Sequence, residues 1–187
     1  MQLVAYLRIQ ARANRLANRR LHAAMAALPE GEFHAPRTSF FPSLAATLNH
    51  ILAVDLYYVG ALHGDTGLVQ KYRAFVPAAT LAEFAPRQAA SDERLIAWCD
   101  ALAGDTAADA VIAMERRDHV QHERAGHVLA HLFMHQTHHR GQVHAMLSGT
   151  AVAPPQLDEF MMPSEAHLRE ADRAALGWSE AEVYGTR

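Results

Sequence analysis

The sequence predicts an all-α protein built as a four-helix bundle, with a short extra helix near the C-terminus. Four long segments repeat apolar residues at intervals of three and four, which places those residues on one face of a helix. Half of the residues are hydrophobic and a fifth are charged, which is typical of a globular protein. At 187 residues the chain fits one domain, 1–187, with the bundle over about 3–150 and an extension over about 151–187.

The first helix is expected over Val4 to Leu28, where leucine and methionine side chains line one face. Residues 29–31, Pro-Glu-Gly, stop it. The segment has five arginines and no acidic residue, a composition that also occurs in mitochondrial transit peptides. Nothing marks a boundary between this segment and the rest, so we interpret it as the first helix of the fold, with its arginines on a solvated face. These arginines are Arg8, Arg12, Arg15, Arg19 and Arg20.

The second helix is expected over about 42–62, after a loop. Another loop then leads to Thr80, which together with Glu83 has the spacing of a capping box and predicts the start of the third helix. Pro86 offers a second candidate start for the same helix, because proline is best tolerated near a helix N-terminus. The third helix is expected to end at Gly104.

Residues 105–123 alternate imperfectly between apolar and polar side chains, so we expect an irregular segment or a short β-hairpin. The fourth helix is expected over 124–148 and contains a dense group of histidines. Two prolines open the last segment, in which Ser164 to Leu176 predict the short fifth helix.

Composition argues against several function classes. A formal net charge of −3 provides no strong basic field to recruit nucleic acid or an acidic membrane. No apolar run reaches the roughly 18 residues of a membrane-spanning helix. The single cysteine, Cys99, lies in an apolar helical run, which predicts a small buried side chain rather than a nucleophile. We therefore expect neither nucleic acid nor a membrane as partner. The expected partner is a small-molecule substrate.

The fourth helix contains the densest chemical signal. Its histidines, His131, His135, His138 and His139, lie three or four residues apart, so that pairs share a face and can grip one metal ion. His131 with His135, His135 with His138, and His135 with His139 all satisfy this spacing, which does not choose among them. A catalytic zinc site usually has three protein ligands. His50, in the second helix, is the candidate third, because facing helices of a bundle direct side chains into a shared core.

Several blocks of the chain together resemble the DinB family, also described as DinB/YfiT-like metalloenzymes. The blocks are Asn14 to Leu28, Phe41 to Ser43 leading to Thr47 through His50 and Asp55, and above all His131 to Gln142, where His-Arg-Gly-Gln is the most specific part. They are scattered over about residues 5–160. The resemblance implies a four-helix bundle of DinB/YfiT type with up-down-down-up character.

The resemblance also implies a divalent metal held by three histidines, His50 from the second helix and the pair His135 and His139 from the fourth. Met134 is a departure, since many relatives have asparagine there, but it removes no ligand. Members of the family are mostly bacterial, cytosolic and often dimeric. We therefore expect a cytoplasmic homodimer.

Three neutral imidazoles would leave a bound ion its full double positive charge and an open coordination position, where a water or thiol would have its pKa lowered. Zinc is the first expectation and nickel the second, because imidazole suits both. Gln142 lies on the same face as His139 and is expected to hydrogen-bond a ligand or a bound water. Asp55 lies about 140° around the helix from His50, so we expect a hydrogen bond from another helix rather than a ligand role. Arg140 is expected to form an ion pair.

Two hypotheses about function follow. The first is a metal-dependent enzyme, related to the thiol-dependent transferases and isomerases among DinB-like proteins, in which a low-molecular-weight thiol attacks an electrophile. The second is a non-catalytic metal-binding or stress-response protein in which the ion pins the bundle together. The ligands have no obvious carboxylate base beside them in the sequence, which is compatible with both.

Overall fold

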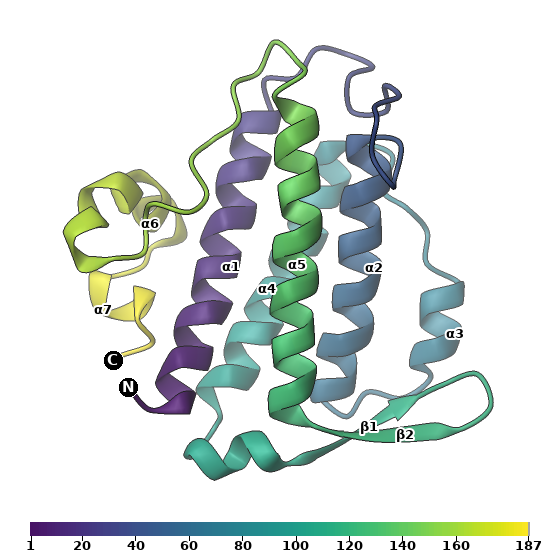
Figure 1. Ribbon diagram of the computed structural model, residues 1–187, viewed down its shortest axis with the longest axis vertical. Coiled ribbons are helices and arrows are strands. Elements are labelled where there is room, and N and C mark those ends of the chain that lie inside the picture. Colours follow the sequence, from purple (N-terminus) through teal and green to yellow (C-terminus); the bar gives the residue numbers. More distant parts are fainter. Residues whose placement is uncertain (187) are drawn as a thin grey trace.

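The computed structural model describes residues 1–186 and confirms an all-α fold. Four long helices lie side by side: α1 (Leu3–Met25), α2 (Leu44–Leu62), α4 (Leu81–Asp100) and α5 (Ala125–Leu147) (Figure 1). Helices α1 and α5 run in one direction and α2 and α4 in the other, which is the expected up-down-down-up order. The main packing pairs are α1 with α4 and α2 with α5.

Side-chain caps begin two of these helices. The hydroxyl of Ser43 accepts a hydrogen bond of 3.0 Å from the backbone N–H of Ala46, and that of Thr80 accepts one of 3.2 Å from Glu83. Each cap satisfies an N–H that has no partner within the helix. The cap at Thr80 confirms the predicted start of α4, and the helix continues through Pro86 without a second start.

Two segments between the long helices needed the structure to define them. A short helix, α3 (Leu68–Arg73), lies where only a loop was expected, after Gly67 with a positive φ of 69°. The imperfect alternation after α4 does form a hairpin, in which β1 (Val111–Glu115) pairs antiparallel with β2 (Val120–Arg124). A 3-10 helix (Asp105–Asp109) precedes it.

The apolar core consists of two main clusters. One surrounds Leu95 and Leu129 at the end of the bundle where α1 begins, and the other surrounds Leu48 and Phe84 at the opposite end. A layer of polar side chains lies between them, and all four long helices contribute to it. Its members are Asn14, Asn18, Asp55, Gln88, Asp92, Gln136 and Arg140.

The prediction of a solvated arginine face on α1 is wrong. Arg12 is 7% exposed and forms two hydrogen bonds of 2.8 Å with the carboxylate of Asp100. Arg8 donates to the backbone carbonyls of Asp100 and Leu102 at 3.0 Å. Arginine can bury its apolar stem along a helix while its head bonds elsewhere. Here the heads hold α1 against the end of α4, where helical carbonyls lack partners.

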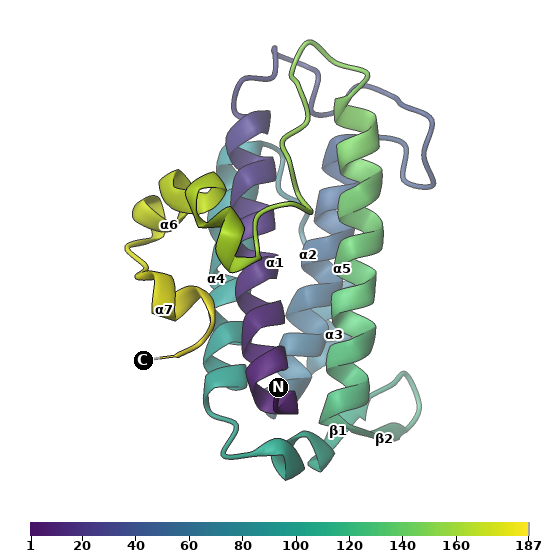
Figure 2. The same ribbon diagram turned by 60° about the vertical axis from the view of Figure 1, so that its left-hand side comes forward.

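The C-terminal extension packs back on α1 (Figure 2). The expected fifth helix is a 3-10 helix (Pro163–Arg169) followed by α6 (Glu170–Leu176), and a further short helix, α7 (Glu180–Val183), comes after it. Phe160 and Val183 cluster with Leu16 of α1. Among the helices of residues 1–186, none has the length and apolar character needed to cross a membrane.

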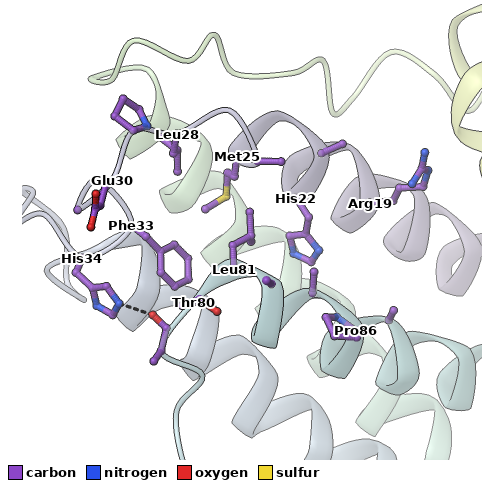
Figure 3. Close-up of a pocket in the computed structure, with 18 of the residues that line it drawn as sticks. Arg19, His22, Met25, Leu28, Glu30, Phe33, His34, Thr80, Leu81 and Pro86 are labelled. Atoms are coloured by element: carbon purple, nitrogen blue, oxygen red, sulfur yellow. Dashed lines mark hydrogen bonds between the residues drawn. The ribbon is translucent and has the colours of Figure 1, made fainter.

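Two hollows on the described part of the chain each have a volume of about 770 Å³. The first lies between the second half of α1 and the start of α4, where His22, Met25 and Leu81 form part of a mostly apolar wall (Figure 3). The second lies between the first halves of α1 and α5. Within the described residues, neither contains a group of three side chains able to hold a metal ion.

Candidate metal centre

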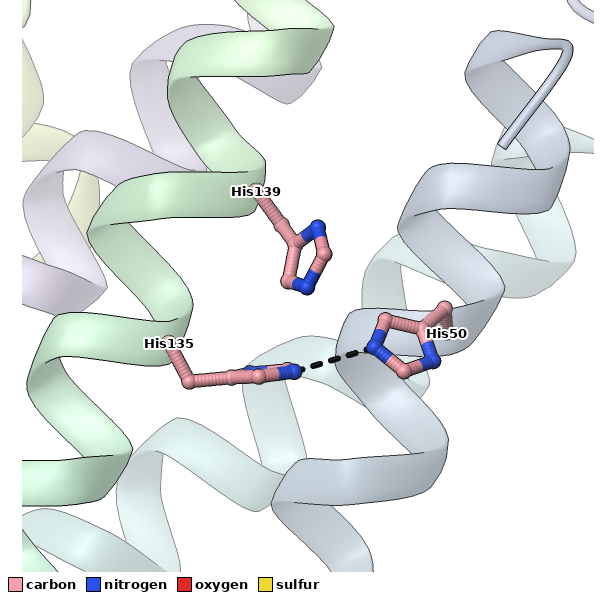
Figure 4. A group of neighbouring side chains, drawn as sticks. All are labelled: His50, His135 and His139. Carbon is pink, nitrogen blue, oxygen red and sulfur yellow. Dashed lines mark hydrogen bonds between the residues drawn. The ribbon is translucent and has the colours of Figure 1, made fainter. Parts of the chain in front are cut away.

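Three histidines from two helices meet on one side of the bundle. His50 lies near the middle of α2, and His135 and His139 lie one turn apart on α5 (Figure 4). One ring nitrogen of each residue lies within 4.8 Å of the corresponding nitrogens of the other two. The Nε2 atoms of His50 and His135 are 3.0 Å apart. The three rings therefore point at a common space, as the sequence spacing and the resemblance together predicted.

The chemistry of this donor set fits a divalent metal ion. Two nitrogens bound to one tetrahedral zinc lie about 3.3 Å apart, close to the separation of His50 from His135. Burial and the neighbouring rings lower the pKa of His135 to about 3, and burial is also the main cause of the lowered pKa of His50 and His139. The imidazoles are therefore neutral at physiological pH, so each keeps a nitrogen lone pair for a cation.

Gln142 orients one of the three rings. Its side-chain oxygen accepts a hydrogen bond of 2.8 Å from Nδ1 of His139, which leaves Nε2 of that ring free to bind. Its amide nitrogen donates to Nε2 of His138 at 3.2 Å. A hydrogen bond to the non-ligating nitrogen commonly fixes the tautomer of a metal-binding histidine. The sequence led us to expect that Gln142 bonds a ligand or a bound water, and in the structure its partner is a candidate ligand, His139.

Phe41 covers the group from the loop before α2. Its ring stacks on that of His50, with centroids 4.3 Å apart and an interplanar angle of 28°, and lies 5.6 Å from the ring of His139. Sequence reasoning gave Phe41 no role beyond its place in a resembling block, because an aromatic residue in a loop has no periodicity to mark its direction. Its contact supplies an apolar lid that reduces access of water to the imidazoles.

Comparison with protein families agrees with this geometry. A model of the DinB family matches residues 7–173, which is most of the chain. The chain belongs to the DinB family. A search of curated proteins found no match.

In this DinB protein the other histidines of α5 lie outside the group. His131 is exposed, and its ring centroid lies 5.0 Å from that of Tyr58 and 6.2 Å from that of His135. His138 is exposed too, and it contacts the group only through Gln142 and the edge of the His139 ring. The structure thus brings His135 and His139 together with His50, and not the alternative pair with His131. Met134 is 73% exposed.

His50 also lines an open hollow of about 460 Å³ on the outer side of α2. Tyr72 and Phe75 form its aromatic wall. Asn49 and Ala78 also line it, and Asn49 accepts a hydrogen bond of 2.7 Å from the N–H of Ala78 and donates one of 3.0 Å to the carbonyl of the same residue. A small molecule can therefore approach His50 from this side. Neither of the two larger hollows is lined by these three histidines. The candidate centre is therefore identified by its donor atoms and not by the size of a hollow.

The polar layer of the core lies directly behind the DinB site. Asp55 is fully buried and accepts hydrogen bonds from Gln88 and Gln136, as expected for a residue that faces another helix. Desolvation raises the pKa of its carboxyl to about 7. Arg140 does not form the expected ion pair. Its guanidinium donates to the side-chain oxygens of Asn14 and Asn18 instead, and within residues 1–186 no carboxylate lies within 4 Å of it.

Cys99 has the role that the sequence predicted. It is fully buried in the apolar cluster near the start of α1, and burial raises the pKa of its thiol to about 12. A thiol in this environment is not a nucleophile at physiological pH.

Proposed function

We propose that this DinB protein is a divalent-metal-dependent enzyme in which His50, His135 and His139 hold the ion. The observation that carries the proposal is the convergence of three neutral imidazoles from two helices, with their donor atoms within 4.8 Å of one another. Zinc is the proposed metal and nickel the second choice, because both suit imidazole nitrogen.

The proposed reaction is the attack of a low-molecular-weight thiol on an electrophilic small molecule, as in a thiol-dependent transferase or isomerase. When bound, the ion would supply an open coordination position and a lowered thiol pKa. The three-histidine group of the described chain includes no carboxylate. The proposed reaction is compatible with this, because the metal and not a carboxylate base would activate the thiol. The chain itself contributes ring orientation through Gln142 and apolar cover through Phe41.

A non-catalytic role for the ion is the alternative, and one observation favours it. The ligands come from α2 and α5, so an ion would cross-link two long helices. However, Gln136 already bonds α5 to Asp55 of α2, and apolar clusters lie on both sides of this contact. Structural zinc sites are also normally closed by four ligands, with cysteine among them. We therefore prefer the catalytic proposal.

The deciding experiment compares apo and metal-loaded protein in conjugation of monochlorobimane with glutathione, cysteine and coenzyme A. Turnover that requires both the metal and one particular thiol supports the enzyme. His139→Ala should abolish it, whereas His127→Ala, which removes an exposed histidine of α5 outside the group, should retain it. Stoichiometric metal binding that raises the melting temperature without turnover of any thiol would favour the structural ion.

The proposal also includes a cytoplasmic homodimer, which the family resemblance supports. Leu3, Tyr6 and Met134 are exposed apolar residues around the hollow between α1 and α5, and a second copy of the chain would cover them. The formal net charge of −3 favours a small molecule over nucleic acid as the partner.

A further inference from the structure

A second, smaller hollow lies further along α2, between that helix, α3 and the turn of the β-hairpin. Its volume is about 300 Å³. Its walls combine aromatic and cationic side chains: Tyr57, Tyr58, Tyr72, Arg73, Arg116 and Arg117. The reaction proposed above gives these residues no role.

The one carboxylate in this hollow already has partners. Glu115 accepts hydrogen bonds from the backbone N–H groups of Gly67 at 2.8 Å and Val69 at 3.4 Å, and these bonds lower its pKa. They satisfy amide groups at the start of α3, which would otherwise have no partner inside the helix. Glu115 therefore anchors α3 to the hairpin. Among the described residues that line the hollow, three arginines and one carboxylate leave an excess of positive charge.

Arg116 is held in place without being neutralised. Its Nη1 donates to the hydroxyl of Tyr57 at 3.0 Å and its Nε to the side-chain oxygen of Gln121 at 2.9 Å. The ion pairs within residues 1–186 involve other arginines, and none of them includes Arg73, Arg116 or Arg117. A guanidinium fixed by neutral partners beside aromatic rings is suited to bind a carboxylate or phosphate.

This hollow adjoins the space in front of His50. Tyr72 borders both hollows. Val54, which lines the cationic hollow, lies one turn after His50 on α2, and Tyr57 lies seven residues after it, a rise of about 10 Å. The ring of Tyr58 contacts His131 at 5.0 Å between centroids. An extended small molecule can therefore place one end near Arg116 and the other near His50.

We propose that Arg116, assisted by Arg73 and Arg117, binds the carboxylate or phosphate of an anionic small molecule whose opposite end lies at His50. The position of the reacting end rests on the proposed function, whereas the anion subsite does not. The subsite selects for anionic thiols or anionic electrophiles, since a neutral compound has no charge to interact with three guanidinium groups that form no ion pair within residues 1–186.

Direct binding tests the subsite without any turnover. Metal-loaded protein is titrated calorimetrically with succinate, with phenyl phosphate and with the neutral succinamide. At least one of the two anions should bind with one-to-one stoichiometry, and succinamide should not. Arg116→Gln should weaken anion binding by roughly tenfold or more, as expected for loss of a charge-assisted hydrogen bond. The control Arg124→Gln removes the same charge from the same hairpin, at an arginine paired with Asp109, and should bind like the parent.

Folding does not limit the test. Arg73 and Arg117 are exposed, so the double variant Arg73→Gln, Arg117→Gln should remain folded. If Arg116→Gln unfolds, weaker anion binding by this double variant tests the subsite instead. Equal anion binding in the parent, both arginine variants and the control would overturn the subsite, and so would the absence of binding at millimolar anion.

Kinetics separates this inference from the proposed function. With glutathione, Arg116→Gln should raise KM while leaving kcat nearly unchanged, and KM for the neutral 2-mercaptoethanol should not move. Anion binding without turnover of any thiol would retain the subsite and reject the proposed reaction. Turnover with identical KM values for glutathione in parent and variant, together with equal anion binding, would retain the reaction and reject the subsite.

Discussion

Gln136 of α5 donates a hydrogen bond of 2.9 Å to the buried carboxylate of Asp55 on α2, and it is the residue directly after His135. Gln88 of α4 donates to the same oxygen at 2.7 Å. The two helices that carry the three histidines are therefore joined by a buried acceptor at the level of the site. Asp55 is best understood as a residue that fixes how α5 is rotated against α2.

Removing this acceptor is expected to affect both stability and metal binding. Asp55→Ala should lower the free energy of unfolding by about 1–3 kcal/mol, because two buried amide groups lose their shared partner. Its metal affinity should fall as well, since α5 can then rotate. Asp55→Asn keeps an acceptor oxygen and should recover most of both properties. Urea unfolding and competition with a chelator measure the two effects, and an unchanged Asp55→Ala protein would contradict the role.

The same carboxyl group predicts a pH dependence. Burial raises the pKa of Asp55 to about 7 and that of Asp92 to about 6, from 3.8 for an unperturbed group. The folded protein therefore holds protons that the unfolded chain releases, so this contribution to stability is complete below about pH 4 and is lost as pH rises through the folded values. His22 and His135, whose pKa values are lowered to about 3, act in the opposite direction.

Comparison with Asp55→Asn isolates the carboxyl from these histidines. As pH rises from about 5 to 7, the metal-free variant should gain stability relative to the parent by roughly 1 kcal/mol per pH unit. In this range the unfolded parent releases the Asp55 proton and is thereby stabilised, whereas asparagine has no proton to release. Urea unfolding at several pH values provides the measurement. A difference that stays constant across this range would show that Asp55 has an ordinary pKa.

Loss of one candidate ligand should impair metal binding far more than folding. His139→Ala is expected to remain helical, because the apolar clusters do not include this residue. Bound metal should add roughly 3 to 4 kcal/mol to the parent's stability when its free concentration exceeds the dissociation constant by 100- to 1,000-fold, and little to the variant. Circular dichroism and metal analysis test this, with His127→Ala as control. A folded His139→Ala protein that retains one tightly bound ion would remove His139 from the ligand set.

The homodimer is the fourth prediction. Light scattering at micromolar concentration should give the mass of two chains, and Met134→Lys should shift it towards one, because a charge in an apolar interface is costly. Val76→Lys is the matched control, since Val76 is also 73% exposed but lies outside the hollow between α1 and α5. A parent mass near one chain would reject the dimer.

The long helices were predictable because each repeats apolar residues with helical spacing and begins or ends at a recognisable residue. The histidine group required more. Spacing left three pairs open on α5, and only the resemblance selected His135 and His139 with His50, the three that the structure brings together. Their role as ligands stays a prediction.

Other features depended on contacts between distant residues, which sequence patterns do not encode. Arg12 looks like a surface residue until Asp100, 88 positions later, is placed beside it. Helix α3 is too short for its periodicity to be recognised, and its start depends on Glu115 from the hairpin. The role of Arg116 likewise became visible only when the hairpin was placed against α2.

The polar layer between the two apolar clusters limits how this protein can change. The clusters share no residue, so substitutions at one end of the bundle can be compensated locally without repacking the other. The layer has no such freedom, because each amide meets its carboxylate only when the four helices keep a single axial offset. Sliding any helix by one turn would strand several buried donors at once. The layer thus fixes the axial register of the four helices. The spacing of the three imidazoles depends on it, because they lie on two of these helices.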